Sequence, residues 1–281
     1  MTPFRRLVWT LLWPVRSYIR CFPIHRGKGL LVNYVLIPIL PRAPATFSAL
    51  LPGGAKVDLK YREQIGLSTL IKGTFEAAEL EYVCDKLKAG DVACDVGANI
   101  GIYSVVMGLQ VQSKGRVMSF EPLPENILRL KGNVLANKLV NVDIYDIALS
   151  GGEGDVNLYL ADDSAYSSTV DVREGRGTGT LLTVKSRRLD DVWKEEGRPL
   201  IKLFKIDVEG SEEQVLNGAL RCIEFCRPTI LIEANEVENL DILKKILHPL
   251  GYKCIQPKGF HSWNWLFEFD DSQLYSAPDR A

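Results

Sequence analysis

The sequence predicts an α/β fold in which helices cover a mostly parallel β-sheet. From Asp91 onward, short apolar runs alternate with stretches of helical spacing, as expected for strands buried on both faces. A turn with two glycines joins the first of these runs to a helix. The composition, with 46% hydrophobic and 25% charged residues among 281, is that of a globular chain with a sizeable core.

The region before this pattern is basic. No acidic residue precedes Asp58, whereas eight basic residues do: Arg5, Arg6, Arg16, Arg20, Arg26, Lys28, Arg42 and Lys56. The apolar runs at 7–13 and 30–40 are shorter than the roughly 20 residues of a membrane-spanning helix. We expect residues 1–54 to form a basic amphipathic helical arm, and residues 55–281 to form the second domain. The arm either packs on that domain as a lid or binds an anionic membrane surface through residues 1–40.

The elements of the second domain follow from periodicity and from glycine and proline positions. Alternation of Val57, Leu59 and Tyr61 predicts short paired strands within 55–75, and the spacing in Phe75–Leu87 predicts a helix. Core strands are expected at 92–96, 116–120, 142–148, 201–206 and 229–233, and helices at 122–137, 210–225 and 237–250.

Two further regions are expected to add strands outside this alternation. Residues 156–160 and 181–185 read as two strands joined by the Gly- and Ser-rich loop 161–180. Near the C-terminal end, residues 252–255 and 263–269 flank a turn around Gly259 and predict a terminal hairpin.

Charge and cysteine content exclude several classes of protein. A net charge of -1 lacks the global attraction to phosphate that a general nucleic-acid binder uses. The six cysteines form no Cys-x-x-Cys pair and have no histidine nearby, so we expect reduced core thiols rather than a zinc site. Reduced thiols predict a cytoplasmic location, at the inner face of the membrane if the arm binds lipid.

The turn after the strand at 92–96 carries the chemistry. It reads Asp95-Val96-Gly97-Ala98-Asn99-Ile100-Gly101, whereas a dinucleotide binder usually has three glycines suited to a pyrophosphate. A leading carboxylate repels a pyrophosphate and attracts an ammonium group. Glu121, at the end of the next strand, can hold both hydroxyls of a ribose. Adenosine joined to an amino acid fits this pair, which favours S-adenosylmethionine.

Four sequence strings in order resemble those of a known family. DVGANIGIYS at 95–104, FEP at 120–122, DIALS at 146–150 and KIDVEGSE at 205–212 together resemble the FkbM family of class I methyltransferases. The resemblance covers roughly residues 70–235. It implies the Rossmann-like class I fold, a seven-stranded mostly parallel sheet with an antiparallel last strand. It also implies S-adenosylmethionine-dependent O-methylation of a hydroxyl on a sugar, glycolipid or natural product.

The same resemblance implies a set of cofactor-binding residues. The turn residues would lie around the methionine half, Glu121 at the ribose, and Ala148 with its neighbours at the adenine. The full set is Asp95, Gly97, Ala98, Asn99, Gly101, Glu121, Pro122, Ala148 and also Asp207.

Asp207, at the end of the strand 201–206, is the leading candidate for a catalytic residue, with Glu209 two residues on. A sugar hydroxyl is a poor nucleophile that a general base assists. Asp207 could instead bind the amino group of the cofactor, or cap the helix that begins near Gly210. A magnesium site formed with Glu233 or Asn235 is a further alternative, although we expect no metal. Lys205 lies on the opposite face of the strand from Ile206 and is assigned no role.

Two other kinds of function are weighed against this one. An RNA methyltransferase acting on base amino groups predicts a basic catalytic face and an Asn/Asp-Pro-Pro-aromatic motif after the fourth strand, where the chain reads DVEG at 207–210. A non-catalytic S-adenosylmethionine-binding module would be expected to lose the cofactor turn, which is intact. The sequence therefore favours an enzyme with a small-molecule or glycan acceptor and no nucleic-acid partner.

Overall fold

The computed structural model describes residues 46–61, 63–161, 177–270 and 272. Most of the predicted N-terminal arm, including residues 1–40, and most of the loop 161–180 therefore lie outside the described residues. The chain divides into two compact units. One comprises Lys56–Phe75 and the described residues up to Leu51, and the other comprises Pro52–Ala55 and the chain from Glu76 onward.

The first unit contains a small hairpin and a helix. Strand β1 (Thr46–Leu50) pairs antiparallel with β2 (Lys56–Lys60), so the boundary expected after Gly54 falls in the connection between two paired strands. The prediction of strands throughout 55–75 is wrong for α4 (Gln64–Lys72). The alternating pattern ends at Tyr61, and Leu67, Leu70 and Ile71 have the spacing of a helical face.

The second unit is built on a seven-stranded sheet, in the order β11-β12-β10-β9-β3-β4-β5. Its strands are β3 (Val92–Val96), β4 (Arg116–Phe120), β5 (Val142–Tyr145), β9 (Ile201–Ile206), β10 (Thr229–Glu233), β11 (Tyr252–Ile255) and β12 (Asn264–Phe269). The strands from β10 to β5 are parallel, and β12 runs antiparallel to both of its neighbours. This is the predicted class I methyltransferase topology, including the reversed last strand, and the predicted terminal hairpin is confirmed.

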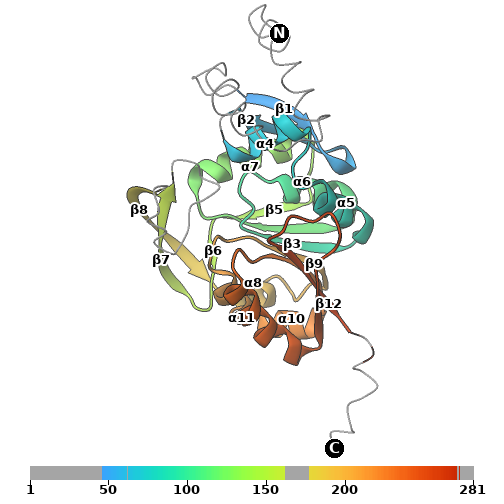
Figure 1. The fold of residues 1–281 in the computed structure, drawn as a ribbon, viewed down its shortest axis with the longest axis vertical. Helices are drawn as coiled ribbons and strands as arrows, with labels where there is room; N and C mark the ends of the chain where they lie inside the picture. Colours follow the sequence, from blue (N-terminus) through green and yellow to red (C-terminus); the bar gives the residue numbers. More distant parts are fainter. Residues whose placement is uncertain (1–45, 62, 162–176, 271, 273–281) are drawn as a thin grey trace, which may run out of the picture. The chain divides into compact units, whose positions relative to one another are not determined.

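Helices cover both faces of this sheet (Figure 1). They are α5 (Ala77–Lys86), α6 (Ile102–Val111), α7 (Pro124–Ala136), α8 (Leu189–Glu195), α9 (Glu212–Asn217), α10 (Leu220–Cys226) and α11 (Val237–Leu247), with short 3-10 helices η2 (Pro52–Gly54) and η4 (His248–Leu250). Helices α5, α6 and α7 lie on one face, and α8, α10 and α11 on the other (Figure 1). The core on the second face includes Phe204, Ile206 and Phe267, each at most 1% exposed.

Two predicted elements are divided in the structure. The helix expected at 210–225 is two helices with a break at Gly218 and Ala219, where Ala219 has a non-helical φ of -122°. Gly218 also lies against the backbone of Ser150, since a Cβ on it would be 2.0 Å from that carbonyl oxygen. The strand expected at 142–148 ends at Tyr145, and the following β6 (Ala148–Leu149) joins a separate three-stranded sheet. The other strands of that sheet are β7 (Gly154–Ala161) and β8 (Gly177–Arg187), which are the two added strands predicted around the loop.

The strand order of the main sheet reverses at its central strand β3. The chain leaves the central strand β3 toward β4 and β5, and it returns to β9 on the other side of β3. Ligands of open α/β sheets bind at the carboxyl ends of the strands beside such a reversal. The turn Asp95–Gly101 and Asp207 both follow strands that end at this point.

Two expectations about the chain as a whole can be compared with the described residues. Within these ranges, no helix is long and apolar enough to cross a membrane. The described cysteines are free thiols, of which Cys94 and Cys222 lie in the core and Cys84, Cys226 and Cys254 are partly buried.

Candidate active site

The turn after β3 is held against its neighbours by backbone contacts. The amides of Gly97 and Ala98 donate to the carbonyl of Phe120, and the amide of Asp207 donates to the carbonyl of Val96. Gly97 has a φ of 77°, and a Cβ on it would lie 1.8 Å from the carbonyl oxygen of Asp207. Only glycine permits both the left-handed backbone and this close approach.

Gly101 has a comparable structural requirement. Its φ is 87°, and a Cβ on it would lie 2.3 Å from the Cδ1 atom of Leu130 on α7. Asn99, between the two glycines, is also left-handed with a φ of 49°, a conformation that asparagine tolerates better than most residues. The glycines predicted to contact a cofactor are thus needed for the fold of the turn as well, and their contact with the cofactor stays a prediction.

Glu121 closes the turn from the end of β4. Its carboxylate accepts hydrogen bonds from the amide of Asn99 at 2.8 Å, the amide of Leu123 at 2.9 Å and the side-chain amide of Asn126 at 3.3 Å. Burial raises the pKa of Glu121 to about 7, against the opposing effect of these hydrogen bonds. Asn126 has no distinguishing signal in the sequence, and its buried Oδ1 atom has no hydrogen-bond partner among the residues that the structure describes.

Asp95, the leading carboxylate of the turn, lies inside the sheet and is 2% exposed. It accepts a 2.5 Å hydrogen bond from the hydroxyl of Ser104 on α6, which in turn accepts one from Ser119. Burial raises the pKa of Asp95 to about 6, although the Ser104 hydrogen bond and the charge of Lys205 lower it. Its predicted place near the methionine half of the cofactor stays a prediction.

Ala148, predicted near the adenine, and Pro122 and Ala98, predicted to bind the cofactor, lie close to the ends of β5, β4 and β3. Pro122 directly follows Glu121, and Ala148 begins β6, where it pairs in register with Ser186 of β8. Ala98 is buried within the turn at 5% exposed. Their contacts with a cofactor stay predictions.

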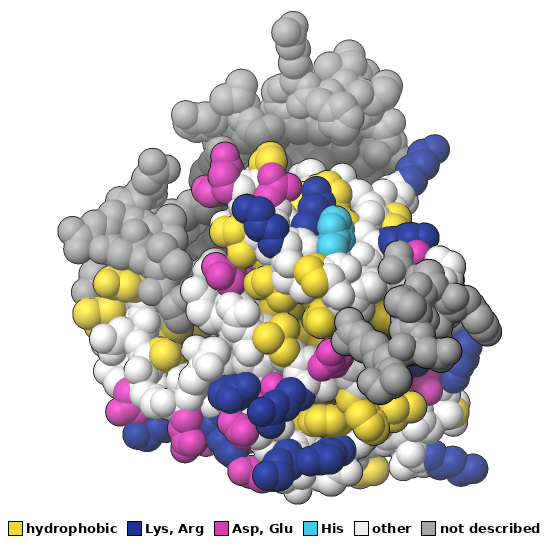
Figure 2. Space-filling view, turned by 90° about the horizontal axis from the view of Figure 1, so that it is seen from below, with side chains coloured by type: hydrophobic (Ala, Val, Ile, Leu, Met, Phe, Trp, Pro, Cys, Tyr) yellow, Lys and Arg dark blue, Asp and Glu magenta, His cyan; other side chains and the backbone are white. Residues whose placement is uncertain are grey.

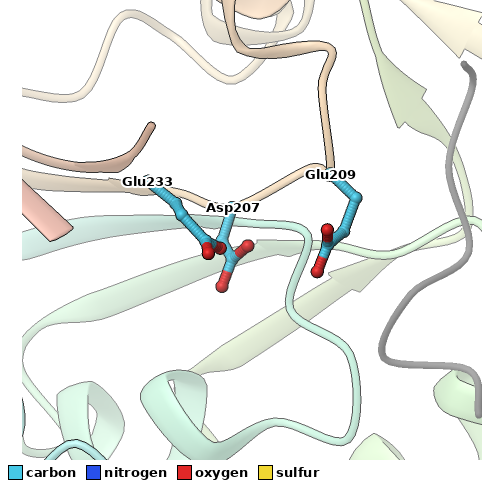
Figure 3. A group of neighbouring side chains, drawn as sticks. All are labelled: Asp207, Glu209 and Glu233. Carbon is cyan, nitrogen blue, oxygen red and sulfur yellow. The ribbon is translucent and has the colours of Figure 1, made fainter. Parts of the chain in front are cut away.

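Three carboxylates gather beyond β9 and β10. Asp207 follows β9, Glu233 ends β10, and Glu209 lies in the loop after Asp207 with a φ of 50°. One carboxylate oxygen of each lies within 4.8 Å of the others. Asp207 and Glu233 point toward one another, and Glu209 extends into the same space from the loop (Figure 3).

Asp207 does not cap the helix that follows β9, because the N-cap residue of that helix, α9, is Ser211 and no side chain makes a cap hydrogen bond there. The amides of Val208 and Gly210 donate to the Oε1 atom of Glu212, at 3.3 Å and 3.1 Å. The carboxylate of Asp207 instead faces Lys205 and Glu233. This leaves the catalytic and cofactor-binding interpretations of Asp207.

Lys205, to which the sequence analysis assigned no role, lies at this site. Its ammonium is 3.3 Å from the Oδ2 atom of Asp207 and 5.1 Å from the centre of the Tyr103 ring, and its side chain is 1% exposed. The predicted alternation is right, because Lys205 does face away from Ile206. The face it occupies is covered by helices rather than by solvent, and there it lies in register with Asp95 of β3.

Glu76 is a second residue that the sequence analysis missed. It precedes α5 with a φ of 41°, accepts a 2.6 Å hydrogen bond from the hydroxyl of Tyr103, and accepts another from Asn264 of β12 at 3.2 Å. Burial raises its pKa, against the lowering effect of Lys205. An acidic residue at a helix start usually interacts with the helix dipole in solvent, so no sequence signal distinguishes it.

The charges at this site are strongly coupled. Burial would raise the pKa of Asp207, but the ammonium of Lys205 and a hydrogen bond from Glu233 together hold it below its ordinary value. Burial and the charge of Asp207 raise the pKa of Glu233 far above its ordinary value. Burial would lower the pKa of Lys205, and the surrounding carboxylates raise it instead.

The carboxylate group also has the spacing of a possible metal site. Oxygen ligands of this kind suit Mg²⁺. The cluster contains Asp207 and Glu233, two of the ligands named in the magnesium hypothesis. Asn235, the other ligand considered, is exposed. The ammonium of Lys205 already supplies a positive charge at 3.3 Å from Asp207, which reduces the attraction of the cluster for a cation.

Comparisons with known proteins place these features in context. The sequence model described as "Methyltransferase FkbM domain" matches residues 95–254. The chain is 30% identical to "31-O-demethyl-FK506 methyltransferase FkbM" of Streptomyces tacrolimicus, over 47% of this chain and 61% of that protein. It is 27% identical to "Hexuronic acid methyltransferase AglP" of Haloferax volcanii, over 52% of this chain and 58% of that protein.

Among solved structures, the chain is similar to a methyltransferase FkbM from Methylobacillus flagellatus KT. The identity is 18% and the TM-score 0.46, over 72% of this chain and 52% of that one. The matches to the two curated relatives span about three fifths of the length of each.

Proposed function

This chain belongs to the FkbM methyltransferase family, and from that premise we propose that it is an S-adenosylmethionine-dependent O-methyltransferase whose acceptor is a hydroxyl of a sugar, glycolipid or natural product. The position of Asp207 carries the proposal. Its backbone oxygen approaches Gly97 so closely that no side chain fits between them, and its side chain stays 32% exposed. An acidic side chain thus stands beside the turn that resembles the cofactor site of the family.

The residues at the end of β4 suit the ribose of the cofactor. The carboxylate of Glu121 can accept from ribose hydroxyls, and the unpartnered Oδ1 atom of Asn126 beside it can accept one more. A buried acceptor without a partner costs about 1–3 kcal/mol, so a ligand hydroxyl there would be favourable. We assign the ribose to Glu121 and Asn126, the methionine half to the turn Asp95–Gly101, and the adenine to Pro122 and Ala148.

Asp207 then serves as the proton acceptor. When bound, the cofactor would supply an electrophilic methyl carbon, whose bond to sulfur would break with the electron pair going to sulfur. Asp207 would take the proton that the acceptor hydroxyl loses as its oxygen is methylated. The pKa of Asp207 is held low, so this carboxylate is a weak base. It takes the proton as the oxygen becomes acidic during bond formation, while Glu209 orients the acceptor from the loop.

The named activities of the relatives support a hydroxyl acceptor. One relative is described as a methyltransferase of 31-O-demethyl-FK506 and the other as a methyltransferase of hexuronic acid. Both descriptions name acceptors that carry hydroxyl groups. We therefore favour an acceptor of the sugar or natural-product kind for this chain.

An RNA acceptor is disfavoured by the charge of the site. Asp207, Glu209 and Glu233 face the space where the acceptor would lie, and carboxylates repel a phosphate backbone. On the face drawn in Figure 2, the described basic side chains are interspersed with acidic and hydrophobic ones. Binders of nucleic acid instead gather basic residues on one face.

Calorimetry with S-adenosylhomocysteine and transfer of labelled methyl groups together test the proposal. The acceptor panel contains methyl glycosides of neutral sugars, uronic acids and amino sugars, as well as macrolide alcohols. Absence of S-adenosylhomocysteine binding by the folded chain would reject the methyltransferase assignment. Binding without transfer to any hydroxyl compound would favour the non-catalytic module.

The role of Asp207 is tested by Asp207→Asn, with Asp241→Asn on the exposed side of α11 as the matched control. General bases contribute about 10²–10⁴-fold to rate, so we expect turnover to fall by that factor while S-adenosylhomocysteine affinity changes little. The control should leave both unchanged. If affinity and turnover fall together, Asp207 is a cofactor-binding residue instead.

A further inference from the structure

Lys205 is a positive charge enclosed in the centre of the sheet. It lies on β9, between β3 and β10, and is 1% exposed. Transfer of an ammonium group out of water is strongly unfavourable unless opposite charges surround it. Lysine at this position therefore requires a compensating environment, and the surrounding elements supply one.

Acidic groups approach Lys205 from every side of the site. Asp95 is its register partner on β3, Asp207 follows β9, Glu233 ends β10, and Glu76 precedes α5. Beneath the ammonium lies the ring of Tyr103 from α6, whose hydroxyl donates to Glu76. One ammonium thus faces four carboxyl groups and one phenol.

One ammonium cannot neutralise four ionised carboxylates, so some of them must keep their protons. Asp207 is the closest to the ammonium, at 3.3 Å, and is the carboxyl group whose charged form Lys205 stabilises most directly. Glu233 faces Asp207 (Figure 3), with one carboxylate oxygen of each within 4.8 Å of the other, and two enclosed carboxyl groups this close do not both ionise. The pair therefore shares one proton, and that proton is on Glu233.

We propose that Lys205 is a positioning residue for methyl transfer, whose ammonium keeps Asp207 ionised and thereby fixes the shared proton of the Asp207–Glu233 pair on Glu233. The proposal rests on the proposed function, in which Asp207 is the proton acceptor. Lys205 itself is enclosed and touches neither cofactor nor acceptor. Its action is to set which of the two carboxyl groups can take the acceptor proton.

The same arrangement assigns a role to Glu233. As a protonated group, Glu233 can donate to Asp207 without adding a second negative charge, and the side chain of Asp207 stays 32% exposed for the acceptor hydroxyl. A glutamine at position 233 can donate the same hydrogen bond, because its side-chain amide carries hydrogens at every pH. Glu233→Gln should therefore preserve the ionised state of Asp207.

The experiment is a carboxyl-carbon NMR titration of the full chain, labelled with ¹³C at aspartate and glutamate carboxyl groups. The signals of Asp207 and Glu233 are identified by their loss in Asp207→Asn and Glu233→Gln. In the unaltered protein at pH 7 we expect Asp207 ionised and Glu233 protonated. An ionised Glu233 or a protonated Asp207 under these conditions would overturn the proposal, and this measurement does not depend on whether any Lys205 variant folds.

Lys205→Met then removes the charge and keeps the length of the side chain. A neighbouring cation lowers a carboxyl pKa by about 1–3 units, so its loss should raise the titration midpoint of Asp207 by at least about one unit. Lys202→Met, an exposed lysine on the same strand, is the matched control and should not move that midpoint. An unchanged midpoint in folded Lys205→Met contradicts the proposal.

Two further measurements separate the proposal from its alternatives. S-adenosylhomocysteine affinity should be similar in Lys205→Met and the unaltered chain, and a more than tenfold loss without a change in the Asp207 midpoint would make Lys205 a cofactor-binding residue. With an acceptor from the panel, the acid limb of kcat/KM should move to higher pH in Lys205→Met. If the panel contains no acceptor but the titrations behave as expected, the charge arrangement stands and the proposed function alone fails.

Discussion

Replacing Gly97 with alanine tests the close contact that joins the cofactor turn to Asp207. The added Cβ would lie 1.8 Å from the carbonyl oxygen of Asp207 and 2.8 Å from its carbonyl carbon. Real Cβ atoms essentially never come closer than 3.0 Å, so the two backbones must separate by about 1.2 Å. Because both partners are backbone, no side-chain rotation can relieve the contact.

The expected loss of stability has two parts. Alanine at a φ of 77° costs about 1–2 kcal/mol of backbone strain. Overpacking against the Asp207 backbone costs about 1–3 kcal/mol more. Gly90→Ala is the matched control, because Gly90 has a φ of 95° and a Cβ on it would have nothing within 4 Å. It should lose only the first part.

Urea denaturation of both variants measures the free energy of unfolding, and calorimetry measures S-adenosylhomocysteine affinity. We expect Gly97→Ala to be less stable than Gly90→Ala by about 1–3 kcal/mol, with weaker S-adenosylhomocysteine binding in Gly97→Ala alone. Equal losses of stability in the two variants, within about 0.5 kcal/mol, would refute the argument from backbone contact.

Two further predictions concern pH and metal ions. Burial raises the pKa of Glu121 to about 7 from an ordinary 4.5, so the folded protein binds the extra proton. Glu121 should therefore make the free energy of unfolding fall by about 3 kcal/mol as pH rises from about 4.5 to 7. In Glu121→Gln this contribution should be absent, so parallel pH curves for the two proteins would contradict the prediction. Because Lys205 already supplies a positive charge to the carboxylates, millimolar MgCl₂ should leave the melting temperature almost unchanged, and EDTA should leave turnover unchanged. A saturable rise in melting temperature that Glu233→Gln abolishes would instead indicate a metal site.

Local sequence patterns were sufficient for the architecture of the second unit. Apolar runs at 92–96, 116–120, 201–206 and 229–233 coincide with β3, β4, β9 and β10, because strands buried on both faces are mostly apolar and stand out from their surroundings. The pair of glycines in the turn was recognisable for the same local reason. The structure adds that Gly97 is required by its contact with Asp207, which joins residues more than one hundred positions apart.

Local sequence patterns do not predict where an element ends when no glycine, proline or capping residue marks its boundary. The alternation of Val57, Leu59 and Tyr61 predicts strands within 55–75, but it ends at Tyr61, and the residues after it form the helix α4. The single helix expected at 210–225 is two helices, α9 and α10, which are separated at Gly218 and Ala219. Neither the end of the alternation nor the break between these helices has a strong local signal in the sequence.

The sequence by itself determined the order of the elements, the cofactor turn and the acidic residue after β9. Only the tertiary structure decided the electrostatic environment of that residue. The alternation of side chains along a strand correctly assigns Lys205 to the face opposite Ile206, but it does not predict which residues cover that face. In a central parallel strand both faces are buried, and the groups opposite Lys205 come from β3, β10, α5 and α6. Which charges meet there depends on packing between distant segments, and this meeting makes Asp207 the ionised member of its pair.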